Sequence, residues 1–203
     1  MRLDLEQTRA VVDRAFDLGI TLFDTADMYG GRGGSETQLG KILGHRRKDI
    51  VLASKFGMAM SDDGTKIGAS RRYIMSAVED SLRRLKTDWI DLYQLHQPDP
   101  LTPLDETMQA LDDLVTQGKI RYIGCSNLPS WQVVESQWIS GIWWISSPQS
   151  SPRWNSRKPS STNCALWVSA NSGDNCIWRW HPSRPMRCIN LLRCPLPLPV
   201  PIR

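Results

Sequence analysis

Apolar, β-forming runs alternate with amphipathic helical segments along the first 140 residues, and this alternation limits the folds open to the chain. The expected strands cover residues 20–26, 49–56, 89–96 and 120–127. The expected helices cover residues 4–18, 35–43, 74–85, 104–115 and 129–138. Strands regularly followed by helices predict a parallel sheet with right-handed crossovers. Both an open doubly wound sheet and part of a barrel satisfy this pattern.

Apolar spacing within the helices predicts which side chains face the core. In residues 4–18 it places Val11, Val12 and Leu18 on the buried face, with Gly19 at the position of a C-terminal cap. Glu36 falls in the first turn of the next helix, where a carboxylate interacts favourably with the helix dipole. The sequence therefore predicts that Glu36 supports the first turn of this helix.

The glycine-rich stretch after the first strand lacks the marks of a nucleotide-binding loop. No GxGxxG motif follows residues 20–26, and the run 30–34 has no Gly-Lys-Ser/Thr ending. We interpret this run as a flexible loop. The usual signs of a doubly wound nucleotide site are therefore missing.

Polar side chains stand where the predicted strands end. They are Asp24 with Tyr29 after the first strand, Lys55, His96, and the pair Ser126 and Asn127. Each has a structural explanation when taken singly, such as a loop cap, an outward-pointing lysine or a turn. A buried, unpartnered charge costs several kcal/mol, so apolar packing would not select all of them together. Since barrel enzymes gather catalytic groups at the carboxyl ends of successive strands, the set favours a barrel.

These residue types together suit proton transfer to an oxygen atom. A tyrosine hydroxyl is a weak acid at neutral pH unless a neighbouring ammonium stabilises the phenolate. A carboxylate beside the lysine holds that ammonium charged and oriented. A neutral histidine can hydrogen-bond a carbonyl oxygen and orient it. Such a site can protonate oxygen while a hydride reaches carbon.

Five motifs in order resemble the aldo-keto reductase superfamily. They are FDTADMYG (23–30), SETQLG (35–40), LASK (52–55), DLYQLH (91–96) and GCSN (124–127). The resemblance covers about residues 4–140 and is closest to the bacterial and potassium-channel-β-subunit-like branch. It implies an α/β fold, a partial (β/α)8 TIM barrel of about four βα units.

The resemblance also implies an activity and a set of site residues. It places the catalytic tetrad at Asp24, Tyr29, Lys55 and His96, and the contacts to the nicotinamide carboxamide at Ser126 and Asn127. The expected function is NADPH-dependent reduction of aldehyde or ketone carbonyls to alcohols, with Tyr29 as proton donor. The alternative is an inactive fragment, or a noncatalytic NADPH-sensing or NADPH-binding protein related to channel β subunits. The carbonyl substrate and the choice between NADPH and NADH stay open.

Composition changes at about residue 140. Residues 1–140 hold 17 Lys and Arg against 20 Asp and Glu, whereas residues 141–203 hold 8 basic residues against one acidic residue. The second part also holds six of the nine Trp and nine of the thirteen Pro, without clear periodicity. We interpret residues 1–140 as a partial aldo-keto reductase barrel and residues 141–203 as an irregular tail, disordered or read out of frame.

The family pattern predicts that the opening hairpin, the first barrel strand and the later strands are missing. A shift of reading frame near residues 138–141 would account for the change in composition. Other interpretations of the tail have less support. The spacing of its four cysteines matches no zinc signature, and a disulfide domain disagrees with a cytoplasmic protein. The run 195–201 could form polyproline II, and the Trp and basic residues could bind RNA or membrane nonspecifically.

Bulk properties narrow the class of protein further. No stretch approaches the roughly 18 apolar residues of a membrane helix, and the charged N-terminus does not resemble a signal peptide. Within residues 1–140 no tract suggests nucleic-acid binding, and the single cysteine, Cys125, suggests no disulfide framework. The sequence predicts a cytoplasmic protein without membrane insertion, a small-molecule carbonyl compound as its partner, and leaves the oligomeric state open.

Overall fold

The computed structural model describes residues 4–140 and the strand segments 145–146, 166–169, 176–181 and 184–190. Five parallel strands form its main sheet: β1 (Leu22–Asp24), β2 (Val51–Phe56), β3 (Ile90–Leu95), β4 (Ile120–Cys125) and β5 (Ile145–Ser146). The order in the sheet is β1-β2-β3-β4-β5, the same as the order in the chain. A doubly wound sheet reverses its strand order at a switch point. The unbroken order therefore confirms the barrel architecture.

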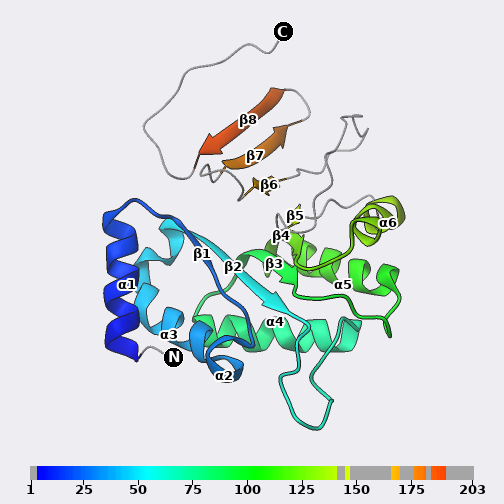
Figure 1. Cartoon of the computed structure of the whole chain (residues 1–203), viewed down its shortest axis with the longest axis horizontal. Coiled ribbons are helices and arrows are strands. Elements are labelled where there is room, and N and C mark those ends of the chain that lie inside the picture. Colours follow the sequence, from blue (N-terminus) through cyan, green and yellow to red (C-terminus); the bar gives the residue numbers. More distant parts are fainter. Residues whose placement is uncertain (1–3, 141–144, 147–165, 170–175, 182–183, 191–203) are drawn as a thin grey trace.

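Helices connect the strands and cover one side of the sheet (Figure 1). Their bounds are α1 (Leu5–Asp17), α2 (Tyr29–Arg32), α3 (Gly34–Leu43), the 3-10 helix η1 (Gly44–Asp49), α4 (Arg71–Leu85), α5 (Leu104–Thr116) and α6 (Ser130–Ser140). The five predicted helices and four predicted strands are confirmed, with ends shifted by a few residues. Tyr29 begins the short turn α2 and does not lie in an open loop. Gly30 and Gly31 inside this turn have φ of +72° and +84°, which glycine adopts without strain.

Local side chains fix where the longer helices begin. Asp4 and Gln7 form a reciprocal capping box on α1, in which the Gln7 amide donates to Asp4 Oδ1 over 2.8 Å. Ser70 caps α4 by accepting from the Tyr73 amide. Gly19 follows α1 with φ of +73°, as a C-terminal glycine should.

The hydrophobic core lies between the helices and the outward face of the strands. From α4 it takes Ile74, Val78, Leu82 and Leu85, which recur at helical spacing along one face of the helix. Strand side chains meet them, and the rings of Phe56 and Tyr93 stack with centroids 4.8 Å apart. The opposite face of the sheet carries a smaller cluster of Ala53, Leu92 and Tyr122. Alternation along each strand thus separates a helix-facing side from an inner side.

The predicted buried face of α1 is partly wrong. Val11 and Leu18 are 58% and 59% exposed, whereas Val12 is buried. Leu5 and Phe16 pack against the core instead, and the Phe16 and Phe23 rings lie 5.3 Å apart. The apolar stripe of α1 therefore runs through Leu5, Val12 and Phe16. Apolar residues outside the stripe misled the prediction because the helix has more than one plausible apolar face.

Helices α3 and α4 approach each other closely at Gly40. A Cβ atom at this position would lie 2.2 Å from the Arg84 carbonyl oxygen and 2.7 Å from the Leu85 carbonyl carbon. Both atoms belong to the backbone of α4, so no side-chain rotation could relieve the clash. Gly40 is buried, and its missing side chain sets the distance between the two helices.

The tail contains strands that its composition does not predict. Strand β5 extends the parallel sheet, and β6 (Leu166–Ser169), β7 (Cys176–His181) and β8 (Arg184–Asn190) form an antiparallel sheet in the order β6-β7-β8. Ile, Val and Trp, which these segments contain, favour strands despite the frequent Pro around them. The proline-rich run 195–201 and the tail cysteine side chains lie outside the described residues. The frame-shift hypothesis and the boundary at residue 140 stay predictions.

Candidate active site

An ion pair between Asp24 and Lys55 lies on the inner face of the sheet, at the carboxyl ends of its strands. Lys55 Nζ donates to Asp24 Oδ2 and, over 3.0 Å, to the Thr25 carbonyl oxygen. Gln94 Nε2 donates to Asp24 Oδ1 over 3.2 Å. The Lys55 side chain is only 7% exposed, whereas the Asp24 side chain is 48% exposed. The ammonium is therefore held inside the edge by oxygen ligands, and the carboxylate reaches the solvent.

Tyr29 and His96 lie beside this ion pair. The Tyr29 and His96 rings meet edge to face, with centroids 5.5 Å apart and planes at 83°. Lys55 Nζ lies 5.1 Å from the centre of the Tyr29 ring, within the range of a cation–π interaction. Tyr29 is 41% exposed, so its ring lies on the solvent side of the site. The structure brings together Asp24, Tyr29, Lys55 and His96, as the sequence predicts.

His96 is held by a backbone hydrogen bond beside the charges of Lys55 and Asp24. Its amide donates to the Phe56 carbonyl over 2.9 Å, which continues the pairing of β2 with β3. Its buried Nδ1 has no hydrogen-bond partner among the described residues. Burial lowers the pKa of His96, the Lys55 ammonium lowers it further, and Asp24 opposes both effects. The imidazole is therefore neutral at pH 7 and can act as a hydrogen-bonding group.

We expect the His96 ring to titrate below the ordinary histidine pKa of about 6.5. Because the folded-state pKa is lowered, His96 contributes stability that is present above pH 6.5, roughly, and is lost as pH falls through the folded value. Ring-proton NMR signals followed against pH, and assigned with His96→Gln, measure the midpoint. A midpoint at or above the ordinary value would contradict the burial argument.

Ser126 and Asn127 extend the site along the end of β4. The Ser126 amide donates to the Leu95 carbonyl over 2.8 Å, and Ser126 is buried. Asn127 has φ of +60°, a left-handed conformation that asparagine tolerates better than most residues. Its Nδ2 donates to the His96 carbonyl over 2.9 Å and to Ser126 Oγ over 3.0 Å. Asn127 therefore links the ends of β3 and β4. This role goes beyond forming a turn.

Gln94 is not among the residues predicted from the sequence, and Glu36 makes more contacts than the sequence predicts. Gln94 lies two residues before His96, so strand alternation places it on the same inner face and could have identified it. Glu36 does not merely support a helix terminus, because it is fully buried. It accepts a hydrogen bond from Ser54 Oγ, and the Arg84 Nε atom donates to it over 2.7 Å. Glu36 lies in the first turn of α3 as predicted, and because this turn faces α4 and β2, it also makes tertiary contacts that its place in the helix does not predict.

Two negative findings apply to the part of the chain that the structure describes. No group of three or more His, Cys, Asp or Glu residues there could hold a metal ion. No helix in the same part is both long and apolar enough to cross a membrane. Cys125 is buried, and this burial raises its thiol pKa to about 12, so it does not supply a nucleophile.

Comparison with known proteins identifies relatives over the same region. The family model described as Aldo/keto reductase family matches residues 1–149. The aldo-keto reductase YhdN of Bacillus subtilis is 43% identical over 128 residues, covering 62% of this chain and 37% of the relative. The L-glyceraldehyde 3-phosphate reductase of Escherichia coli K12 is 37% identical, covering 61% and 37% of the two chains. A putative voltage-gated potassium channel subunit beta of Schizosaccharomyces pombe is 36% identical, covering 68% and 41%.

A solved structure gives the same result. The holo form of an aldo-keto reductase from Bacillus halodurans superposes with a TM-score of 0.64 at 41% identity. The match covers 71% of this chain and 48% of that chain. The chain thus spans less than half the length of these relatives.

Proposed function

The chain belongs to the aldo/keto reductase family, and from this membership we propose that it is an NADPH-dependent oxidoreductase that reduces aldehyde or ketone carbonyls to alcohols. The observation that carries the proposal is the contact of Lys55 with both Asp24 and the Tyr29 ring, beside a neutral His96. In barrel enzymes the catalytic residues come from the carboxyl ends of the strands, which is where these side chains lie. In this proposal Tyr29 is the proton donor.

The residues at this edge fit a nicotinamide cofactor. The buried Nδ1 of His96 lacks a partner among the described residues, and the Ser126 hydroxyl lies on the same edge. We assign Ser126 and Asn127 to the cofactor carboxamide, because hydroxyl and amide groups can both donate to and accept from such a group. When bound, the nicotinamide supplies the hydride for the carbonyl carbon.

The described side chains would carry the proton side of the reaction. Tyr29 donates its hydroxyl proton to the carbonyl oxygen as negative charge develops there. The Lys55 ammonium, 5.1 Å from the Tyr29 ring centre, stabilises the phenolate that forms. Asp24 and the Thr25 carbonyl keep the ammonium in place. Neutral His96 directs the carbonyl oxygen toward Tyr29 by hydrogen bonding without adding a competing charge.

Replacing Lys55 tests the proposal at its central contact. The full chain should oxidise NADPH only when an aldehyde such as 4-nitrobenzaldehyde is present, with one alcohol formed per NADPH. Lys55→Met should lower kcat by roughly tenfold to a hundredfold, because the phenolate loses its neighbouring cation. Lys41→Met, at an exposed position of α3, is the matched control and should leave kcat unchanged.

Three outcomes would count against this proposal. A folded sample that binds NADPH without oxidising it would indicate a noncatalytic binding protein. A folded sample that neither binds nor oxidises NADPH would remove the cofactor assignment. Equal activity of Lys55→Met and Lys41→Met would remove Lys55 from the mechanism. Circular dichroism of each variant establishes that it is folded.

A further inference from the structure

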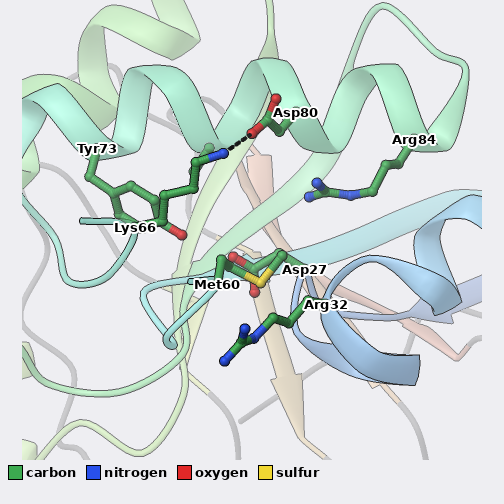
Figure 2. A pocket seen from close by; sticks show the side chains of 8 residues that line it. Asp27, Arg32, Met60, Lys66, Tyr73, Asp80 and Arg84 are labelled. Atoms are coloured by element: carbon green, nitrogen blue, oxygen red, sulfur yellow. Dashed lines mark ion pairs between the residues drawn. The ribbon is translucent and has the colours of Figure 1, made fainter. Parts of the chain in front are cut away.

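A pocket of about 180 Å³ lies beside Asp27, in the segment that joins Asp24 to Tyr29. Asp27 and Met60 lie on one side of it, and α4 lies opposite with Tyr73, Asp80 and Arg84 (Figure 2). The residues that line it are Asp27, Arg32, Met60, Lys66, Tyr73, Ala77, Asp80 and Arg84. This pocket is on the helix side of β2, not on the inner edge that holds the ion pair of Lys55.

The Asp27 carboxyl is the unusual group in this pocket. Asp27 is 1% exposed, and no side chain among the described residues donates a hydrogen bond to its carboxyl oxygens. Burial raises the pKa of Asp27 to about 7, and the nearby Glu36 carboxylate raises it too, against lowering by the Met28 amide and Arg84. Burial without an ion-pair partner disfavours the charged form of a carboxyl group. Asp27 therefore changes charge close to neutral pH.

Helices α3 and α4 present charged groups that are already paired with one another. Arg84 on α4 pairs with Glu36 on α3, at 2.7 Å. Asp80 on α4 forms ion pairs with the Lys66 and Arg83 side chains. The Arg84 charge lowers the pKa of Asp27, but its effect is the smallest of the four.

The other elements around Asp27 do not neutralise it either. Arg32 on α2 pairs with Asp62, and the Tyr93 hydroxyl on β3 is buried. The Asp27 charge contributes to the raised pKa of Tyr73 and of Tyr93. Among the described residues, Asp27 therefore forms no ion pair.

The backbone connects Asp27 directly to the catalytic groups. The Asp27 amide donates to the Lys55 carbonyl over 3.1 Å. The Thr25 carbonyl, two residues earlier, accepts from Lys55 Nζ over 3.0 Å. The Tyr29 amide, two residues later, donates to the Ala26 carbonyl over 3.1 Å. These hydrogen bonds connect Asp27 to the Lys55 backbone and, through Thr25, to the Lys55 ammonium, so Asp27 and Tyr29 belong to one short segment that is held on Lys55.

We propose that Asp27 is a positioning residue for the reduction, whose neutral carboxyl keeps residues 24–29 packed on Lys55. The inference rests on the proposed function for its link to catalysis, while the conformational part concerns this chain alone. When Asp27 ionises, its carboxylate requires water or a cation, and the segment shifts toward the pocket to provide it. Tyr29 then leaves its place beside Lys55, and turnover slows.

Asp27→Asn removes the ionisation and keeps the size of the side chain. In the wild-type chain, kcat should fall by roughly threefold or more as pH rises from 6 to 8, in step with ionisation of a group near 7. In Asp27→Asn this fall should disappear, with KM for the aldehyde little changed. Asp88→Asn, at an exposed position, is the matched control and should keep the wild-type profile.

A second measurement does not depend on activity. The ring signals of Tyr29 in the chain without cofactor, assigned with Tyr29→Phe, should shift with a midpoint near pH 7 in the wild type and not in Asp27→Asn. Asp27→Ser provides a second neutral variant if Asp27→Asn does not fold. Identical pH profiles of kcat and of the Tyr29 signals in wild type and the folded neutral variants would overturn the inference. An inactive wild type whose Tyr29 signals still follow Asp27 would overturn only the proposed function.

Discussion

Replacing Tyr29 with phenylalanine should lower kcat for aldehyde reduction by roughly 10²–10⁴-fold, the range typical for loss of a general acid. The substitution removes only the hydroxyl group, so the ring at position 29 can keep its edge-to-face contact with His96. Its position 5.1 Å from Lys55 Nζ can also be kept. Binding of NADPH should therefore change little, since the loss falls on the proton-transfer step.

Steady-state kinetics and fluorescence titration with NADPH measure the two effects separately. Tyr122→Phe is the matched control, because Tyr122 is a half-buried tyrosine on β4 that packs beside Ala53 and Leu92. It should keep kcat within about twofold of wild type, as expected for a residue outside the proton path. Equal losses in both variants would show that general tyrosine packing, and not proton donation, explains the effect.

Replacing Glu36 with alanine should destabilise the fold by about 3 kcal/mol, at the lower end of the range for a broken buried ion pair. Glu36 is fully buried, and its carboxylate accepts from both Ser54 Oγ and Arg84 Nε. Without it, Ser54 loses an acceptor and Arg84 becomes an unpaired cation beside the core. The lower end of the range applies because the Arg84 side chain retains 21% exposure and can reach water.

Chemical denaturation of the full chain at pH 7 measures this loss. Glu79→Ala is the matched control, since Glu79 on the same side of the fold pairs with Lys119 at the surface. Exposed pairs contribute about 0–1 kcal/mol, so this variant should remain close to wild type. Glu36→Gln keeps the size of the side chain and should lose less than Glu36→Ala. Equal stabilities of Glu36→Ala and Glu79→Ala would disprove a structural role for the buried pair.

The sequence predicts the architecture well because two signals act at short range. Apolar spacing identifies the helices and strands, and their alternation predicts a parallel sheet. The positions of Asp24, Lys55 and His96 at strand ends then bring these residues to one edge without any further information. The predicted tetrad comes together for this reason.

The rest depends on contacts between elements that sequence spacing does not specify. Glu36 could be recognised as buried only once α3 is placed against α4. Asp27 looks like an ordinary loop residue until its neighbours exclude water from it. The exposed Val11 shows the converse, because apolarity alone does not say which face of α1 meets the sheet. In each case, tertiary packing overrides a local pattern.

The close approach at Gly40 has a consequence for protein engineering. Exchanging a helical glycine for alanine is a common route to higher thermal stability, because alanine restricts the unfolded chain and favours helix. At Gly40 the same exchange would push Arg84 and Leu85 away from α3. Variant libraries that raise helix propensity uniformly should therefore leave this position fixed, and homologues that carry a larger residue here should show a wider spacing between the two helices.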